Sequence, residues 1–304
     1  MSESNKSVLY KLAGLFFSIR GYNLIIIVLA QYLAAIFILS PDELTLSDVL
    51  LDVNLFILVL CNALVIASGY LINSFYDSEK DLINKPYKTF LDNAVSQQTK
   101  LSLYFIINFV SVVLASYISF RAVLFFSGFI FGIWLYSHKL KRITFLGNVV
   151  AALLAITPFF AVFIYYKHVE NIIFFHASFL FLLILIREII KDLESLKGDF
   201  AQDYKTIPVI YGEQQTKIIL SSLIGVAVII NGLFLYFFNL GYMVYYFYLS
   251  FLAYIALGIL VWISSKKVHF RILHNLLKLL IVVGVFSILL IDVDLILRKV
   301  LLKL

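Results

Sequence analysis

Long segments of the 304-residue chain contain no Asp, Glu, Lys or Arg. A helix rises about 1.5 Å per residue, so a crossing of the hydrocarbon core, about 30 Å thick, needs roughly 20 apolar residues. The longest uncharged run, 218–265, has 48 residues and exceeds a single crossing. Asn239, Leu240 and Gly241 can form a turn in its middle, so we expect two spans there. The remaining spans are expected at 21–41, 53–76, 101–120, 122–137, 143–166, 171–186 and 272–291, which gives nine in all.

The composition agrees with a membrane protein. Of all residues, 62% are hydrophobic and 14% are charged, whereas soluble domains carry about a quarter charged residues. This excludes a disordered chain, a nucleic-acid-binding domain and an ordinary cytosolic enzyme. Cys61 is the single cysteine, so no disulfide forms within one chain. No two histidines have the spacing that would form a zinc site together with this cysteine. We therefore expect an all-α integral membrane protein in which residues 1–304 form one domain.

The distribution of Lys and Arg predicts the orientation in the inner or plasma membrane of the cell. With a cytoplasmic N-terminus, 18 of the 24 basic residues fall in cytoplasmic segments and five on the opposite side. Membrane proteins concentrate Lys and Arg on the cytoplasmic side. We therefore expect two long cytoplasmic loops, at 77–100 and 191–217, and a C-terminus on the opposite side. Residues 1–20 indicate a retained segment whose amphipathic part, about 8–19, lies on the membrane surface.

A first polar cluster stands at the end of the second span. Asn73, Asp77 and Asp81 follow one another at intervals of four residues, and each such step turns a helix by about 40°. The three side chains therefore share one helical face. Carboxylates and a carboxamide are hard oxygen ligands of the kind that Mg²⁺ prefers. An ordinary helix end with acidic residues in the headgroup region would show the same pattern.

A second polar cluster stands at the end of the sixth span. Asp192, Ser195 and Asp199 are spaced i, i+3, i+7 and share a helical face, which Glu188 continues. Glu188 and Arg187 follow sixteen uncharged residues, so we expect them near membrane depth, where charges are costly and usually paired or functional. A cytoplasmic helix with mixed charges and salt bridges is the alternative interpretation.

The two clusters together indicate a diphosphate site. Both are expected on the same side of the membrane, so they can face one cavity and hold more than one Mg²⁺. Lys and Arg side chains would clamp a diphosphate that magnesium bridges, and an apolar helix bundle would hold a long hydrocarbon. This combination favours a prenyl diphosphate as substrate. The accompanying basic residues are Arg20, Lys85, Lys88, Lys139, Lys141, Lys191, Lys197 and Lys205.

These motifs resemble the UbiA superfamily of intramembrane prenyltransferases. Asn73, Asp77 and Asp81 resemble its first aspartate-rich motif. The segments 187–194 and 205–208 most resemble the digeranylgeranylglyceryl phosphate synthase-like branch, which makes archaeal lipids. Further resemblances are carried by Asn84-Lys85-Pro86, by the Tyr-Ser and Lys-rich segment 136–142, by Gly147 with Asn148, by Gly198 with Asp199, and by Arg20 with Asn23.

The resemblance implies a fold and a reaction. The fold would have nine transmembrane helices around a central cavity, with a cytoplasmic cap formed by the loops 77–100 and 191–217. The reaction would be Mg²⁺-dependent transfer of a prenyl group, geranylgeranyl for this branch, from a prenyl diphosphate to a lipid acceptor, geranylgeranylglyceryl phosphate, with release of diphosphate. The partners would be these substrates and the lipid bilayer, with no nucleic acid and no obligatory protein partner.

The resemblance also implies roles for individual residues. The metal ligands would be Asn73, Asp77, Asp81, Asp192 and Asp199, and the four aspartates among them would be catalytic. The diphosphate-binding residues would be Lys88, Tyr136, Lys139, Lys141, Asn148 and Lys197. The acceptor-binding residues would be Arg20, Asn23, Arg187, Lys191 and Ser195.

The chain departs from the family pattern at two places. Ser195 stands where the family has an aspartate, and Asp192, one turn earlier, could supply the missing carboxylate. Lys88 stands in for an arginine that the family carries after the first motif. Both departures leave open an aromatic acceptor such as a quinone precursor. A transporter with polar residues along its pathway and an inactive binding protein would also be compatible with these motifs.

Overall fold

The computed structural model describes residues 13–41, 43–84, 89 and 94–293. Within these ranges every regular element is a helix, and nine helices are long and apolar enough to cross a bilayer. These findings confirm the predicted all-α membrane fold and its number of spans. The central cavity and the cytoplasmic cap stay predictions.

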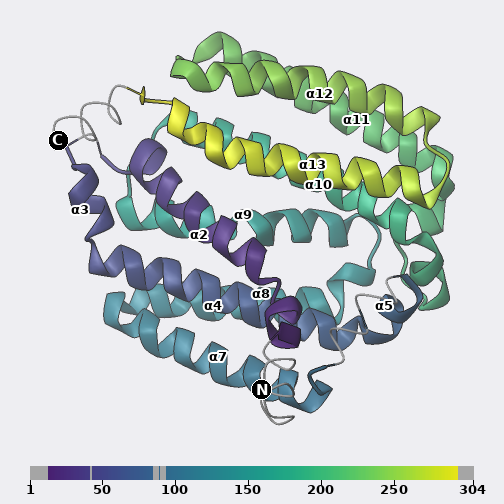
Figure 1. The fold of residues 1–304 in the computed structure, drawn as a ribbon, viewed down its shortest axis with the longest axis horizontal. Helices are drawn as coiled ribbons and strands as arrows, with labels where there is room; N and C mark the ends of the chain where they lie inside the picture. Colours follow the sequence, from purple (N-terminus) through teal and green to yellow (C-terminus); the bar gives the residue numbers. More distant parts are fainter. Residues whose placement is uncertain (1–12, 42, 85–88, 90–93, 294–304) are drawn as a thin grey trace, which may run out of the picture. The chain divides into compact units, whose positions relative to one another are not determined.

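Each predicted span corresponds to one helix or to a helix with a short continuation (Figure 1). Local polar caps fix several helix starts: at α4, the Asp52 carboxylate accepts the N–H groups of Asn54 and Leu55 at 2.9 and 3.2 Å. Such caps satisfy first-turn N–H groups that have no partner inside the helix. The long helices are α2 Gly21–Ala34, which continues as the π-helical segment Ala35–Leu39, α4 Val53–Tyr76, α7 Gln97–Ile118, α8 Phe120–His138, α9 Leu146–Tyr166, α10 Asn171–Ala201, α11 Ile207–Phe237, α12 Val244–Ile263 and α13 Lys267–Ser287. The short elements are α3 Leu46–Leu50, α5 Ser78–Asn84 and the 3-10 turns Leu140–Arg142, Gly241–Met243 and Ile288–Leu290.

The chain forms two compact units. Of the described residues, those within Met1–Val28, Asp52–Val150 and Ser195–Thr206 form the first unit, and those within Leu29–Leu51, Ala151–Glu194 and Ile207–Leu304 form the second unit. Helix α10 therefore contributes its longer part to the second unit and its last two turns to the first unit.

Helix α4 lies at the centre of the first unit. It packs against α7 and α8, which also contact each other (Figure 1). Gly69 allows the close approach of α8, because a Cβ atom at this position would lie 2.9 Å from Cγ2 of Ile133. Ser68 Oγ donates a buried hydrogen bond of 2.6 Å to Asn108 Oδ1 of α7, and such bonds fix the register of apolar helices because an unpaired polar group there is costly. This packing holds the end of α4, where the first polar motif lies.

The second unit consists largely of α11, α12, α13 and the first part of α10. Helix α11 packs on α12, and α12 packs on α13 (Figure 1). The ring of Phe234 lies 4.6 Å from that of His176 and 4.5 Å from that of Phe247, both in edge-to-face geometry. Aromatic pairs of this geometry add about 0.5–1.5 kcal/mol beyond their buried area. An aromatic core therefore joins α10, α11 and α12.

The connection that the sequence predicts at 191–217 is far shorter in the structure. Helix α10 continues to Ala201 and α11 begins at Ile207. The predicted span ends at the first charged residue, but charged side chains do not interrupt backbone hydrogen bonds, so the helix extends beyond its apolar part. Of the amphipathic segment predicted at about 8–19, residues 8–12 lie outside the described residues, and residues 13–18 are helical.

Candidate active site

Asp77 collects hydrogen bonds from three segments of the first unit. Its Oδ1 atom accepts from Lys141 Nζ at 2.7 Å and from the Tyr204 hydroxyl at 2.9 Å. Its Oδ2 atom accepts from Asn73 Nδ2 at 2.9 Å. Lys141 Nζ also donates to Asn73 Oδ1 at 3.2 Å. The structure thus joins three residues that the sequence singled out, Asn73, Asp77 and Lys141, and adds Tyr204 to them.

The surroundings of Asp77 keep it ionised. Burial raises the pKa of a carboxyl group, because it disfavours the charged form. The charges of Lys141 and Lys80, with the hydrogen bonds from Lys141 and Tyr204, outweigh burial and lower the pKa of Asp77 to about 2. Asp77 is therefore a carboxylate at neutral pH, placed among cations.

Tyr204 reaches Asp77 because of the way α10 ends. Asp203 adopts a left-handed backbone φ of 53°, and the N–H of Tyr204 bonds to the carbonyl of Asp199 at 2.9 Å. This Schellman arrangement ends a helix and turns the chain sharply. Burial and the Asp77 carboxylate both raise the pKa of the Tyr204 hydroxyl above its usual value, so Tyr204 remains a hydrogen-bond donor.

Two further cations lie over the Tyr204 ring. Lys80 Nζ is 4.2 Å and Arg142 Cζ is 4.9 Å from the ring centroid, within the range of a cation–π interaction. The N–H of Lys205 donates to the carbonyl of Arg142 at 3.0 Å, and Thr144 Oγ1 donates to the carbonyl of Lys205 at 2.6 Å. These bonds hold the segment after α8 against the segment after α10.

Asp199 is paired with Lys80. Lys80 Nζ lies 2.5 Å from Asp199 Oδ1, and the exposed fractions of the two side chains are 15% and 0%. Asn84, one turn after Lys80 on α5, donates from Nδ2 to the carbonyl of Ser195 at 3.2 Å and accepts from the N–H of Gly198 at 3.3 Å. Helix α5 is therefore attached directly to the last two turns of α10.

The predicted residues of the first helix lie beside α4. The Arg20 guanidinium lies 4.8 Å from the centroid of the Tyr70 ring, and Asn23 Nδ2 donates to the Tyr70 hydroxyl at 3.4 Å. Tyr70 precedes Asn73 by three residues on α4, so both side chains approach the same part of this helix.

The other predicted residues of the first unit differ in burial. Asp81 and Tyr136 are half-buried, and Ser195 and Asn148 are buried. Lys139 and Lys197 are exposed. Lys88 lies outside the described residues.

The remaining predicted residues belong to the second unit. Asp192 is buried there. The Glu188 carboxylate pairs with Lys191 and with Arg187, whose Nη1 lies 3.1 Å away. Glu194 is also buried, and its two oxygens lie 3.1 Å from Arg271 Nε and 2.9 Å from His274 Nδ1, both on α13. The second motif is therefore divided between the units, with Asp192 in one and Ser195 and Asp199 in the other.

Lys80 and Tyr204 are site residues that the sequence did not single out. Lys80 lies between the two aspartates of the first motif, but it counted only as one of many basic residues of a cytoplasmic loop. Tyr204 directly precedes the segment 205–208 that carries part of the family resemblance. The signal that could have identified these two residues was their position, within the first motif for Lys80 and directly before a recognised segment for Tyr204.

The donor set fits Mg²⁺ at the first motif. Asn73 and Asp77 present oxygen atoms to one cation already, the Lys141 ammonium, and Asp81 follows one turn later. Oxygen ligands from one or two carboxylates are typical of Mg²⁺ sites, which keep several waters or phosphate oxygens. The fit is poorer at the second motif, since the part of α10 in the first unit offers one carboxylate, Asp199, which Lys80 neutralises.

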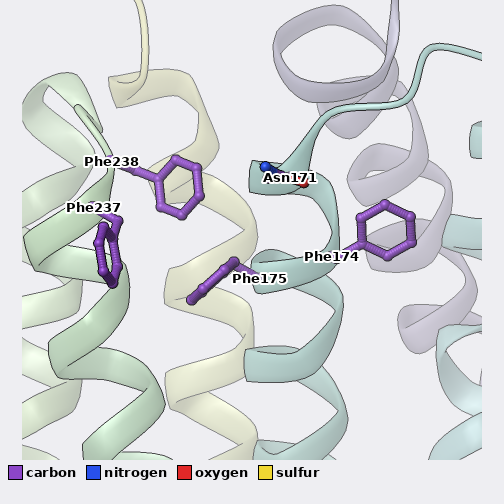
Figure 2. Close-up of a pocket in the computed structure, with 5 residues that line it drawn as sticks. All are labelled: Asn171, Phe174, Phe175, Phe237 and Phe238. Atoms are coloured by element: carbon purple, nitrogen blue, oxygen red, sulfur yellow. The ribbon is translucent and has the colours of Figure 1, made fainter.

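An aromatic pocket lies in the second unit (Figure 2). Phe175 of α10 and Phe238, just beyond α11, approach each other in it, with ring centroids 5.0 Å apart. The other lining residues are Asn171, Phe174 and Phe237. None of the five carries a charge, so this pocket suits an apolar group and lacks the chemistry of the Asp77 cluster.

Comparisons with known proteins identify relatives of this chain. The family model described as the UbiA prenyltransferase family matches residues 16–282. A digeranylgeranylglyceryl phosphate synthase from Thermococcus sibiricus is 36% identical over 167 residues, which cover 54% of this chain and 58% of that protein. One from Methanobrevibacter smithii is 28% identical over 239 residues, which cover 74% of this chain and 80% of that protein. The matched segment thus spans little more than half of the Thermococcus relative.

Solved structures share the fold. One, from a study of digeranylgeranylglyceryl phosphate synthase in membranes, has a TM-score of 0.68 and 21% identity, and covers 91% of this chain and 97% of that chain. Another, a UbiA homolog from Archaeoglobus fulgidus bound to GPP and Mg²⁺, has a TM-score of 0.66 and 15% identity, and covers 90% of this chain and 99% of that chain.

Proposed function

Since the chain belongs to the UbiA prenyltransferase family, we propose that it catalyses Mg²⁺-dependent transfer of a geranylgeranyl group from its diphosphate to geranylgeranylglyceryl phosphate. The nine long apolar helices in the described part of the chain make it an integral membrane protein. The observation that carries the proposal is the convergence of Asn73, Lys141 and Tyr204 on the Asp77 carboxylate. Ionised oxygen ligands surrounded by cations are what a metal-bridged diphosphate requires.

The names of the relatives support the choice of substrates. Both relatives described above are named digeranylgeranylglyceryl phosphate synthase, a name that specifies a glyceryl phosphate product. The Archaeoglobus structure holds GPP together with Mg²⁺, which supports a diphosphate donor and a magnesium cofactor for this fold.

The proposed reaction exchanges one C–O bond for another. The bond between the allylic C1 and the diphosphate oxygen breaks, and the diphosphate leaves with the bonding electron pair. The acceptor hydroxyl oxygen forms an ether bond to C1, and its proton passes to the released diphosphate. Bound Mg²⁺ would supply Lewis-acid stabilisation of the leaving group.

The residues of the first unit have distinct roles in this proposal. Asn73, Asp77 and Asp81 would hold Mg²⁺ through their oxygen atoms. Lys141, now bonded to the first two of these, would also neutralise the diphosphate as its charge grows. The Tyr204 hydroxyl holds Asp77 Oδ1 at 2.9 Å and so orients the carboxylate.

Arg20 and Asn23 are our candidates for binding the acceptor phosphate. Both contact Tyr70, which lies on α4 three residues before Asn73, so they approach the α4 segment that carries the proposed metal ligands. Arg187 and Lys191 pair instead with Glu188, and a role for them in acceptor binding stays a prediction.

We further propose that the N-terminus and the motif-bearing helix ends face the cytoplasm. The excess of basic residues on that side supports this orientation. Single cysteines introduced as Phe145→Cys and His168→Cys into a Cys61→Ala background test it. A membrane-impermeant maleimide should label the second variant in intact cells and the first only after lysis. The reverse pattern would refute the orientation.

A transfer assay tests the proposed function. The protein in detergent is incubated with radiolabelled geranylgeranyl diphosphate and Mg²⁺, with geranylgeranylglyceryl phosphate in one tube and 4-hydroxybenzoate in another. We expect a labelled lipid in the first tube that is absent after addition of EDTA. Label in the second tube alone would assign an aromatic acceptor and contradict the lipid acceptor. Transfer in neither tube would refute both assignments, and release of diphosphate in detergent would itself argue against a transporter, which needs a sealed vesicle.

A further inference from the structure

We propose that Lys80 takes the place of a second divalent cation, so that the site binds one Mg²⁺ together with its prenyl diphosphate. This inference rests on the proposed function and adds to it a metal stoichiometry and a role for Lys80. Four features of the first unit support it: the ion pair with Asp199, the surroundings of the ammonium group, the attachment of α5 to α10, and the residue at position 195.

The ion pair is buried and close. Lys80 Nζ lies 2.5 Å from Asp199 Oδ1, and the Asp199 side chain is 0% exposed. A carboxylate without access to water is costly unless a cation neutralises it. In this chain the Lys80 ammonium group supplies that cation, and no second carboxylate lies one turn away on α10 to share a metal ion with Asp199.

Tyr204 provides a second contact for the ammonium group. Its ring centroid lies 4.2 Å from Lys80 Nζ, and the electron-rich face of the ring stabilises a cation there. The same tyrosine donates its hydroxyl to Asp77. Tyr204 therefore connects the lysine-neutralised carboxylate with the carboxylate proposed to bind magnesium.

The attachment of α5 explains why Lys80 reaches Asp199. Asn84 bonds through both ends of its amide to α10, to the carbonyl of Ser195 and the N–H of Gly198. A Cβ atom at position 198 would lie 2.2 Å from Asn84 Nδ2, so this approach requires glycine. Lys80 lies one helical turn before Asn84. The two hydrogen bonds of Asn84 to α10 therefore also bring Lys80 to the end of α10.

Position 195 removes the alternative ligand. A carboxylate one turn before Asp199 could share a metal ion with it, but the chain has Ser195 there. The next acidic residue toward the N-terminus on this face, Asp192, is seven residues away, and such residues are about 10 Å apart along a helix. Oxygen ligands of Mg²⁺ lie about 2.1 Å from the ion, so Asp192 and Asp199 are too far apart along α10 to bind one ion together.

The stoichiometry of Mn²⁺, a spectroscopically visible substitute for Mg²⁺, tests the inference directly. The detergent-solubilised protein is equilibrated with excess Mn²⁺ and an unreactive thiolo analogue of geranylgeranyl diphosphate, and bound metal is measured by equilibrium dialysis. We expect one Mn²⁺ per chain. Two Mn²⁺ per chain in the unmodified protein would overturn the inference, whatever the variants do.

A double variant tests the role of Lys80 itself. In Lys80→Met with Ser195→Asp, the ammonium group is absent and a second carboxylate is present, so we expect two Mn²⁺ per chain. The exposed neighbour Glu79 offers a matched control, and the Glu79→Gln variant should still bind one Mn²⁺ per chain. A folded double variant that still binds one Mn²⁺ would also overturn the inference.

The outcomes separate this inference from the proposed function. Prenyl transfer by an unmodified protein that binds two Mn²⁺ would uphold the proposed function and refute the proposal that Lys80 replaces a second cation. No analogue-dependent Mn²⁺ binding and no transfer would refute both. One Mn²⁺ per chain together with transfer to the lipid acceptor would support both.

Discussion

Helix α10 carries acidic side chains in both units, and they are paired in different ways. In the second unit, Glu188 is paired within the helix by Arg187 and Lys191, and Glu194 is held by Arg271 and His274 of α13. In the first unit, Asp199 at the helix end pairs with Lys80 of α5, beside the cluster around Asp77.

The difference suggests different tasks. Glu188 of the second unit is matched by two bases of its own helix α10, and Glu194 is matched by two residues of α13, so the Glu194 contacts join two helices. Asp77 instead receives donors from α4, from the turn after α8 and from the segment after α10. A cluster assembled from separate segments can exchange some of its internal bonds for bonds to a ligand. We therefore expect substitutions in the first unit to change activity and those in the second unit to change stability.

Replacement of the central carboxylate should give the largest effect. Asp77→Ala removes a proposed metal ligand and the carboxylate acceptor that Lys141 and Tyr204 share. Loss of about 4 kcal/mol of transition-state stabilisation corresponds to roughly a 1,000-fold lower kcat/KM. The prenyl-transfer assay in detergent measures it.

Glu79 provides the control for this change, because it is an exposed acid two residues further on. Glu79→Ala should leave kcat/KM within about twofold, as surface substitutions usually do little. If Asp77→Ala were no worse than Glu79→Ala, the first unit would not hold the active site.

Removal of the Lys141 ammonium group should give the next largest effect. Lys141→Met keeps most of the side-chain volume but leaves Asp77 and Asn73 without their shared donor. We expect kcat to fall about 100-fold, equivalent to about 2.7 kcal/mol. Lys139→Met, at an exposed position two residues earlier, is the matched comparison. Equal losses in the two variants would argue against a specific role for Lys141.

The positions of the spans and the length of α10 differ in how far the sequence reveals them. The nine spans found among the described residues could be predicted, because uncharged runs indicate directly where the chain meets lipid. The length of α10 could not, since hydropathy does not record where a helix ends; that end depends on Asp203, which accepts a left-handed conformation.

The candidate site was predictable where it depends on local periodicity. Asn73 and Asp77 share a face because they are one turn apart, and their hydrogen bond confirms it. Tyr204 is 127 residues from Asp77, so no local pattern could pair them. The partners of Glu194 on α13 likewise depend on tertiary packing that a helical pattern does not contain.

The clamp of the second unit, formed by Glu194, Arg271 and His274, should affect stability rather than turnover. Glu194→Gln removes the charge that Arg271 and His274 share, and a buried polar group that loses its partner typically costs about 1–3 kcal/mol. Unfolding can be followed through Cys61, which is buried and therefore reacts with a fluorogenic maleimide only when the fold opens. We expect earlier unfolding on heating but a kcat within about threefold of the unmodified protein. A large loss of kcat in the folded variant would move the second unit into the catalytic machinery.

The depressed pKa of Asp77 predicts that its contribution to stability depends on pH. Its folded pKa, about 2, lies below the usual value of about 3.9, so its contribution to stability is present above about pH 4 and is lost as the pH falls toward 2. The contribution is about 2 kcal/mol. Without metal, the difference in thermal stability between the unmodified protein and Asp77→Asn should be constant from pH 7 to 5 and shrink below pH 4. Trp fluorescence reports it, and a difference that grew on acidification would contradict the assignment.

The smallest effect separates the two partners of Glu194. The Arg271 side chain is 50% exposed, whereas that of His274 is 15% exposed. Water screens an exposed pair, and such pairs contribute at most about 1 kcal/mol. Arg271→Gln should therefore lower stability by less than about 1 kcal/mol, and His274→Gln should lower it more, because the buried Glu194 oxygen then loses its most shielded partner. Thiol-reactivity melting curves of the two variants, recorded side by side, measure this order. The reverse order would mean that the exposed arginine, and not the buried histidine, carries the contact between α10 and α13.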